Sequence, residues 1–327
     1  MKKIRALGLS SGGLDSILAA LVLRQQGIEV VWAAFETPFF DATNARKASD
    51  KYEIPLLVKE ITQHYLPMLK QPEGGYGRAM NPCKDCHSLM FREAGVLMEK
   101  EGFDFLFSGE VSGQRPMSQT SSALRYVEKR SGYEGRILRP LSARILPETP
   151  VEQQKLVDRD RLFGFQGRGR KQQLALAKEL GVRDFPAPAG GCLLTDLNFG
   201  RKLKDLLEHH RDVDALDCHL LKGGRHFRLD PQSKLIVGRT AKDNELLQRY
   251  IDKDRHCRIR TVNVPGPLGV ICGPADSHTR HLAAGIVAGY TKATDLETVT
   301  LRFDGGGQRE QLEALPLRSS RIRELMI

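Results

Sequence analysis

The sequence lacks any apolar run of about 18 residues or more, so it predicts no transmembrane helix. The short apolar stretch near the N-terminus ends at Ser10-Ser11-Gly12-Gly13 without a plausible cleavage site, which argues against a signal peptide. We interpret this stretch as the first buried strand of the fold. Internal repeats and low-complexity tracts are also missing, which excludes a repeat architecture. These absences predict a cytoplasmic protein with no membrane partner.

Cysteine is scarce, with six residues in a chain of 327. In a cytoplasmic chain, cysteines serve more often as ligands or catalysts than as disulfides. Hydrophobic residues make up 40% and charged residues 28%, so the chain can bury real cores and is not of the disordered class. The length favours about two domains.

Positive charge exceeds negative charge, with a formal net charge of +10. The excess is uneven, because residues 115–183 carry 15 Lys/Arg against 7 Asp/Glu. Within that stretch the glycine-rich loop 167–171 offers Arg168, Arg170 and Lys171. A flexible basic loop of this kind can follow a phosphate backbone, so we expect RNA contact here. A merely solvated basic face is the alternative.

The first half of the chain alternates between strand-like and helix-like segments. Strands are expected at 4–9, 29–35, 55–58 and 103–107, and helices at 16–26, 42–52 and 88–101. This alternation predicts an α/β fold with a parallel sheet covered by helices on both faces. Ligands of such sheets bind beyond the carboxyl ends of the strands, where the turns after Leu9 and Phe107 fall.

Later segments differ in pattern. Residues 139–169 are rich in proline and charge and show no clear period, whereas 198–211 fits a charged amphipathic helix. Beyond residue 214, short strands with turn signals surround one helix at about 277–290. We therefore expect a catalytic domain at 1–200, a linker helix at 201–212 and a smaller α+β domain at 213–327.

A glycine-rich turn, Ser11-Gly12-Gly13-Leu14-Asp15-Ser16, follows the first strand and opens the first helix. The glycines let backbone amides approach a phosphate, and the helix N-terminus adds partial positive charge. Ser11 and Ser16 can donate hydrogen bonds, and Asp15 can hold Mg²⁺. The turn has neither the Walker nor the Rossmann pattern. An ordinary capped turn is the structural alternative.

The pattern S-G-G-x-D-S resembles the PP-loop ATP pyrophosphatases, an adenine nucleotide alpha hydrolase-like fold. The resemblance implies that a substrate oxygen attacks the α-phosphate of ATP, which gives an adenylated intermediate and pyrophosphate. In related enzymes an acidic loop after a later strand lies against the nucleotide. The resemblance implies that Gly109, Glu110 and Gln114 of this chain bind ATP. We expect Arg115 to extend from the same loop toward RNA.

Three cysteines stand apart from the rest: Cys83 and Cys86 in N-P-C-K-D-C-H, and Cys192 in a Gly-Gly-Cys turn. A redox dithiol would need only the first two. A zinc site would want a fourth ligand, such as His87. A [4Fe-4S] cluster held by three thiolates leaves one iron open, which could carry hydrosulfide to an activated base.

A PP-loop combined with these three cysteines resembles the tRNA thiolation enzymes. In cluster-dependent members, a C-x-x-C and one distant cysteine hold the iron–sulfur cluster, and in other members two separated cysteines carry sulfur as a persulfide. The resemblance therefore implies a catalytic set of Asp15, Cys83, Cys86 and Cys192, with cluster chemistry favoured over a persulfide.

The C-terminal part contains V-G-R-T-A-K-D-N-E-L-L at 237–247 and V-P-G at 264–266. Arg239, Lys242 and Asn244 could contact phosphate and sugar, although a strand–turn–helix with a basic edge explains them too. Their order and spacing resemble the NFACT-type RNA-binding domain. That family usually has an aromatic residue and a histidine in the strand before V-P-G, where this chain has D-R-H-C-R-I-R at 254–260.

Together these resemblances imply a tRNA sulfurtransferase that uses ATP, Mg²⁺ and a [4Fe-4S] cluster to convert a uridine of tRNA to thiouridine. We expect 4-thiouridine slightly ahead of 2-thiouridine, because no anticodon-reading element is visible. The sulfur donor is expected to be sulfide or a cysteine desulfurase, and a homodimer is plausible for enzymes of this kind. Two alternatives stay open: a PP-loop synthase for a small molecule, and an RNA-binding protein with a vestigial ATP site.

Overall fold

The computed structural model describes residues 3–187, 192–294, 297–305, 307–318 and 320–327. The chain divides into two compact units, Met1–Thr195 and Asp196–Ile327. Among the described residues, no helix combines the length and the apolar character that a membrane crossing requires.

A five-stranded sheet forms the centre of the first unit. Its strands are β1 (Arg5–Leu9), β2 (Glu29–Glu36), β3 (Leu56–Glu60), β4 (Phe105–Ser108) and β5 (Ile137–Leu138). They lie in the order β3-β2-β1-β4-β5, and all neighbours pair in parallel. The central strands are apolar along their length because helices cover both faces of the sheet.

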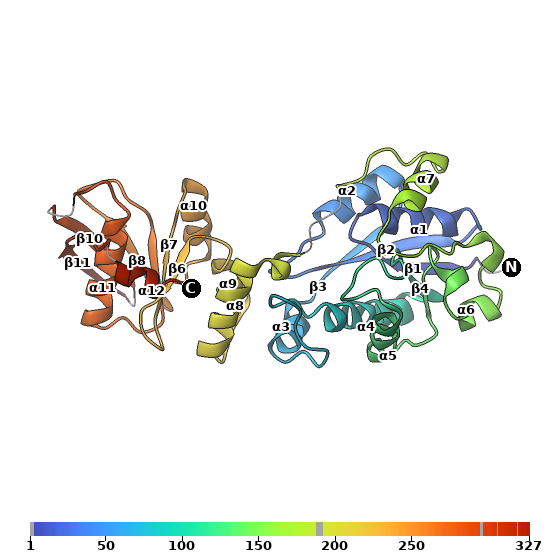
Figure 1. Ribbon diagram of the computed structural model, residues 1–327, viewed down its shortest axis with the longest axis horizontal. Coiled ribbons are helices and arrows are strands. Elements are labelled where there is room, and N and C mark those ends of the chain that lie inside the picture. The colour runs from blue at the N-terminus through green and yellow to red at the C-terminus, as the bar shows by residue number, and fades with distance from the viewer. Residues whose placement is uncertain (1–2, 188–191, 295–296, 306, 319) are drawn as a thin grey trace. The chain divides into compact units, whose positions relative to one another are not determined.

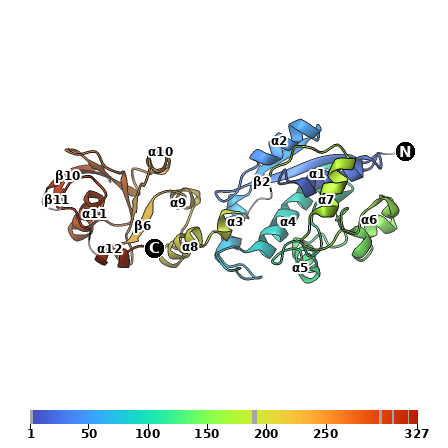
Figure 2. The same cartoon turned by 45° about the horizontal axis from the view of Figure 1, so that its top comes forward.

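Two layers of helices enclose this sheet (Figures 1 and 2). On one side lie α1 (Leu14–Arg24), α2 (Thr43–Tyr52) and α7 (Lys171–Glu179). On the other lie α3 (Thr62–Lys70), α4 (Cys83–Glu101) and α5 (Ser121–Ser131). The segment between β5 and α7 contains only short helices: η1 (Ala143–Ile145), α6 (Pro150–Gln153) and η2 (Arg159–Arg161).

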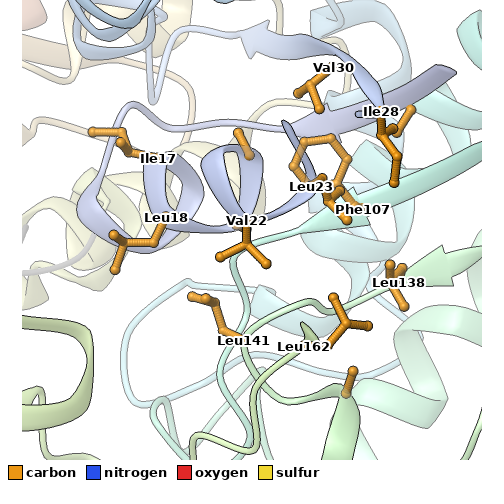
Figure 3. Close-up of a cluster of buried hydrophobic side chains, with 14 of the residues drawn as sticks. Ile17, Leu18, Val22, Leu23, Ile28, Val30, Phe107, Leu138, Leu141 and Leu162 are labelled. Carbon is orange, nitrogen blue, oxygen red and sulfur yellow. The ribbon is translucent and has the colours of Figure 1, made fainter. Parts of the chain in front are cut away.

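The main core of the first unit lies around α1. Figure 3 shows Leu18 and Val22 of α1 facing Leu141 and Leu162, which belong to the irregular segment after β5. Phe107 of β4 packs in the same cluster and is fully buried. Nearly every side of α1 is therefore apolar, as a helix between a sheet and a covering segment requires.

The order of the strands creates a switch point between β1 and β4. From β1 the chain proceeds to β2 on one side, whereas β4 joins the sheet on the other side. The loops that follow β1 and β4 therefore leave the sheet at the same edge and in opposite directions. Open parallel sheets form their ligand crevice at this place.

The second unit contains an antiparallel six-stranded sheet in the order β11-β10-β8-β9-β7-β6. Its strands are β6 (Arg225–Arg228), β7 (Lys234–Val237), β8 (His256–Thr261), β9 (Gly269–Cys272), β10 (Val299–Gly305) and β11 (Gln308–Ala314). Its helices are α8 (Leu197–His209), α9 (Ala215–Leu220), α10 (Ala241–Tyr250), α11 (Ser277–Gly289) and α12 (Ser320–Glu324), and η3 (Leu193–Thr195) precedes them. The apolar side of α11 packs on one face of the sheet (Figure 1).

Short polar caps fix where the helices of the second unit begin. The carboxylate of Asp196 accepts a hydrogen bond from Phe199 N at 2.7 Å at the start of α8. Thr240 caps α10 in the same way through Asp243 N, and Asp276 caps α11 through Thr279 N. Such caps satisfy backbone N–H groups that have no partner inside the helix.

The predicted fold class, a parallel α/β domain followed by a smaller α+β domain, is confirmed. Two local predictions were wrong. The pattern beyond residue 214 predicted one helix, at about 277–290, whereas α9, α10 and α12 are present besides α11. The sequence pattern put C-x-x-C in a turn before a helix at 88–101, whereas α4 begins at Cys83 itself. Pro82 stands at the N-cap, where a missing N–H costs nothing, and Asp85 in the first turn suits the positive end of the helix.

Candidate active site

The phosphate-loop residues connect β1 to α1. Ser16 Oγ donates to Gly13 O at 2.8 Å and lies 3.3 Å from Ser10 Oγ, which accepts a hydrogen bond from Gly12 N. Gly13 stands at the N-cap of α1 and provides no side-chain cap. The helix therefore presents its amino end, with its partial positive charge, at the predicted phosphate site. Ser11 is exposed beside it.

Two glycines allow very close packing at this point. Gly12 has a φ of +71°, and a Cβ on it would lie 2.2 Å from Asn44 O. A Cβ on Gly109, in the loop after β4, would lie 2.3 Å from the carbonyl carbon of Asp15. The two loops at the switch point are therefore in direct backbone contact, which is possible only without side chains at these positions.

The side chain of Asp15, at the start of α1, lies beside that of Gln114. Its Oδ2 accepts a hydrogen bond from Gln114 Nε2 at 3.1 Å, whereas its Oδ1 is buried without a hydrogen-bond partner. Gln114 Oε1 and Arg170 Nε are also buried without one. Buried polar atoms without partners are uncommon and suit a ligand or an ion that they would contact.

Two arginines lie within electrostatic reach of Asp15. Burial raises the pKa of Asp15 above its usual value, and the hydrogen bond from Gln114 and the positive charges of Arg170 and Arg115 offset only part of that rise. The segments that hold these arginines are joined, since Gly167 N donates to Ser112 O at 2.8 Å. Arg115 and Arg170, which were predicted to contact RNA, thus also lie within electrostatic reach of the phosphate loop.

Glu110 is buried in a network of its own. It accepts hydrogen bonds from Ser108 Oγ and from Arg139 Nε, each at 3.1 Å, and its other oxygen lies 2.8 Å from His87 Nδ1. Burial alone would raise its pKa, but the charges of Arg139 and His87 hold the pKa at about 2. Arg139 also pairs with Glu128.

Glu110 therefore holds His87 in place. Both carboxylate oxygens of Glu110 have partners within the protein. Its predicted contact with ATP stays a prediction. The histidine directly follows Cys86 in the first turn of α4, so the network joins the cysteine segment to the loop after β4.

The three predicted cysteines come from two distant segments. Cys83 accepts a hydrogen bond from Asn81 Nδ2 at 3.2 Å, and Cys86 accepts one from Tyr65 OH at 3.5 Å. Cys192 is exposed, and the glycines before it lie outside the described residues. All three are free thiols.

The three thiols lie within electrostatic reach of one another. Burial raises the pKa of Cys86 to about 12, and Cys192 and Cys83 raise it further against the hydrogen bond from Tyr65. Partial burial of the Cys192 thiol raises its pKa too, and Cys83 contributes in the same direction. Within the residues that the structure describes, no group of three His, Cys, Asp or Glu side chains could hold a metal ion.

The remaining predicted contact residues lie on the surface. Arg168 is exposed, and Lys171 begins α7. In the second unit, Arg239 pairs with Asp243 at 2.7 Å, and Lys242 is exposed. Asn244 Oδ1 accepts a hydrogen bond from Leu268 N at 3.2 Å and so holds the loop before β9. Their contact with RNA stays a prediction.

The sequence pattern does not indicate a role for Arg139, and it suggests His87 only as a zinc ligand. The signal for His87 was present, since it directly follows the second cysteine. Arg139 lies in the stretch without periodicity, and only the pairing of β5 with β4 brings it to Glu110. No local pattern could have found it.

Comparison with known proteins adds to this geometry. Residues 224–326 match the family described as NFACT protein RNA binding domain. A tRNA-specific 2-thiouridylase MnmA of Clostridium botulinum is 29% identical over 131 residues, covering 34% of this chain and 36% of that protein. A probable tRNA sulfurtransferase of Methanosarcina mazei is 31% identical over 121 residues, covering 35% of this chain and 29% of that protein. This chain is similar to tRNA thiolation enzymes.

The predicted resemblance to tRNA thiolation enzymes and to an NFACT-type RNA-binding domain is thereby confirmed. The chain spans about a third of the length of the first of these curated relatives. Among solved structures, a predicted subunit of a tRNA methyltransferase from Methanocaldococcus jannaschii matches with a TM-score of 0.36 and 17% identity, covering 54% of this chain and 75% of that one.

Proposed function

We propose that the protein is an ATP-dependent tRNA sulfurtransferase that converts a uridine of tRNA to thiouridine. The uridine carbonyl oxygen attacks the α-phosphate of ATP, pyrophosphate leaves, and the base is held as an adenylate. A sulfur nucleophile then attacks the activated carbon, and AMP departs with the former carbonyl oxygen. Adenylation is needed because a carbonyl oxygen is a poor leaving group and AMP is a good one.

One observation carries this proposal: a short series of contacts joins the phosphate loop to the cysteines. Gly109 packs on the backbone of Asp15, the next residue Glu110 bonds His87, and His87 follows Cys86. An enzyme that activates a base and then supplies sulfur needs both groups at one site, because the adenylate must not meet water first.

The residues of the phosphate loop fit ATP with Mg²⁺. The free Oδ1 of Asp15 is a hard oxygen ligand of the type that Mg²⁺ prefers. The amino end of α1 and Ser11 would bind phosphate oxygens. Arg115 and Arg170 would balance the negative charge that pyrophosphate carries away, which makes them candidate phosphate ligands as well as RNA contacts.

For sulfur delivery, we propose that Cys83, Cys86 and Cys192 hold a [4Fe-4S] cluster. Three thiolates are the chemical donor set that such a cluster takes, and these three cysteines lie within electrostatic reach of one another. In the described residues they do not form a ready-made group of metal ligands, so binding of a cluster would have to draw the two cysteine segments together. A bound cluster would supply an iron position for sulfide. The competing proposal is a persulfide on Cys192, the exposed member, with a cysteine desulfurase as donor.

The second unit would recruit the tRNA, in keeping with its match to an RNA-binding family. The net charge of +10 favours a polyanionic substrate over a small neutral one. For the product we retain 4-thiouridine as the first expectation, and the name of the 2-thiouridylase relative makes 2-thiouridine its competitor.

The test is an anaerobic reaction of the purified protein with unmodified tRNA, Mg-ATP and sulfide, followed by mass spectrometry of the digested nucleosides. Thiouridine should form with the wild type and vanish with Cys192→Ala. The matched control is Cys272→Ala, because that cysteine belongs to the second unit and should leave turnover unchanged.

Chromatographic retention distinguishes the two thiouridine isomers. Formation of thiouridine with a desulfurase and cysteine, but without iron in the protein, would favour the persulfide proposal. Cleavage of ATP without any thionucleoside, under every sulfur supply, would refute the proposed function.

A further inference from the structure

The second unit carries a cluster of arginines on one face of its sheet. Arg258 and Arg260 of β8 point to the same face because they are two residues apart in a strand. Arg302 of β10 lies directly opposite Arg260 in the antiparallel register, and Asp304 lies opposite Arg258. The other face, with Ile259 and its neighbours, packs under α11 and forms the core.

The pairing of Arg260 with Arg302 is unfavourable in the isolated protein. Residues directly opposite in an antiparallel pair have Cβ atoms about 5 Å apart, and like charges at such positions destabilise a sheet. Partial burial, together with the charges of Arg258 and Arg302, lowers the pKa of Arg260. The fold therefore keeps a local repulsion that a neutral side chain would remove.

Acidic groups compensate only part of this charge. The single carboxylate of Asp304 is shared by Arg258 at 2.8 Å, Arg302 at 3.5 Å and Arg309 at 2.8 Å. Arg260 donates instead to the neutral Gln248 of α10 at 2.6 Å. Within the described ranges no ion pair neutralises Arg260.

The cluster is also accessible. The side chain of Arg302 is 41% exposed, that of Arg309 is 80% exposed, and Arg260 is exposed. Arg258 is largely covered and holds Asp304, so it fixes the cluster rather than extending from it. Gln248 and Gln311, which lies opposite Arg302, add neutral hydrogen-bonding groups on the same face.

We propose that this face, centred on Arg260 and Arg302, binds the phosphodiester backbone of RNA. Guanidinium groups match phosphate oxygens with two parallel hydrogen bonds, and a bound phosphate would turn the repulsion between the arginines into attraction. Phosphate contacts of this kind position RNA without reading its sequence. The inference rests on the tRNA-binding part of the proposed function.

The test measures the affinity of the full-length protein for unmodified tRNA at several salt concentrations. The variants are Arg260→Gln, Arg302→Gln and the double change. Each single change should weaken binding roughly threefold to tenfold, and the double change should lower the slope of log K against log salt by about 1 to 2. The melting temperature should change little, because removal of the repulsion offsets the loss of the contacts to Asp304 and Gln248.

The matched control is Lys292→Gln, which removes one exposed positive charge after α11, the helix that covers the opposite face. It should leave affinity and slope unchanged. Arg260→Lys should retain part of the affinity, since the charge is kept but the two parallel hydrogen bonds of the guanidinium group are lost.

The site is refuted if the double variant binds tRNA with wild-type affinity and slope, or if Lys292→Gln weakens binding as much. Binding of the wild type to anionic vesicles or acidic peptides in place of tRNA, through these arginines, would overturn it as well. Failure of the proposed function looks different: tRNA would bind through the arginines, yet no thiouridine would form.

Discussion

At the scale of single residues, Asp15 is the most informative side chain of the first unit. Half of its carboxylate is engaged by Gln114, and the other half is buried without a partner. A buried carboxylate oxygen without a hydrogen-bond partner is available to a ligand or an ion. The unsatisfied oxygen is therefore what would be expected of a metal ligand whose ion arrives with ATP.

The first prediction follows from that oxygen. Asp15→Asn keeps the size of the side chain but removes the charge that would hold Mg²⁺. We expect thiouridine formation to fall by at least about a hundredfold, as losses of one preorganised electrostatic group do. The matched control, Asp50→Asn on the exposed side of α2, should react like the wild type. An active Asp15→Asn protein would rule out the metal role.

The second prediction concerns the network around Glu110. Its pKa of about 2 lies below the ordinary value of 4.5, so its ionised form stabilises the fold above pH 4.5 and this stabilisation is lost as the pH falls toward 2. From the two pKa values, the wild type should lose about 2 kcal/mol between pH 5 and pH 3 through this group. Urea unfolding at both pH values should show a smaller loss for Glu110→Gln. Equal losses would show that Arg139 and His87 do not hold the charge.

The third prediction separates the two sulfur chemistries. In Cys83→Ser, the donor set of the cluster loses one thiolate while Cys192 and Cys86 stay available for a persulfide. Iron content and visible absorption after anaerobic reconstitution should drop, and activity should drop in parallel. Retained activity in an iron-free Cys83→Ser protein supplied with a persulfide donor would contradict the cluster.

Candidate site residues could be predicted from the sequence where they belong to a motif of neighbouring positions. The turn S-G-G-L-D-S and the C-x-x-C needed only neighbouring positions to be recognised. The sequence could not assign Glu110 its partner Arg139, because the ion pair joins the ends of two strands that are 29 residues apart. It also could not place the charge of Arg170 near Asp15. That proximity depends on how the irregular segment after β5 returns to the sheet.

At the scale of elements, the site depends on the close approach of two loops. The fourth prediction tests it: in Gly109→Ala the added Cβ would lie 2.3–2.5 Å from the backbone of Asp15 and Ser16. Backbone atoms cannot move aside cheaply, so we expect a destabilisation on the order of 1–3 kcal/mol and weaker ATP binding. Gly169→Ala is the matched control, since its Cβ meets nothing within 4 Å. Thermal unfolding and ATP titration measure both effects.

Elements with strong periodicity were predictable, and elements fixed by tertiary contacts were not. The strand at 29–35 and the helix at 42–52 match β2 and α2 within one residue at each end. By contrast α5 was not expected, although Thr120 caps it and Gly132 ends it. Its apolar side chains are few, and it gains its stability from packing on α4.

At the scale of the whole molecule, two units with different surfaces would serve one reaction. In the proposed function, the first unit supplies the nucleotide and sulfur chemistry at the switch point of its parallel sheet. The second unit carries the arginine face on an antiparallel sheet. Such a division lets RNA affinity be changed on the second unit without altering the chemistry on the first, as the arginine variants would demonstrate.

In the proposed reaction the uridine carbonyl oxygen leaves on AMP. The most direct measurement uses tRNA whose uridines carry ¹⁸O at both carbonyl positions, with mass spectrometry of the AMP released during thiolation. We expect one ¹⁸O atom in AMP for each thiouridine formed, whichever isomer is made. AMP without ¹⁸O, or ADP and phosphate as the products of ATP, would contradict it.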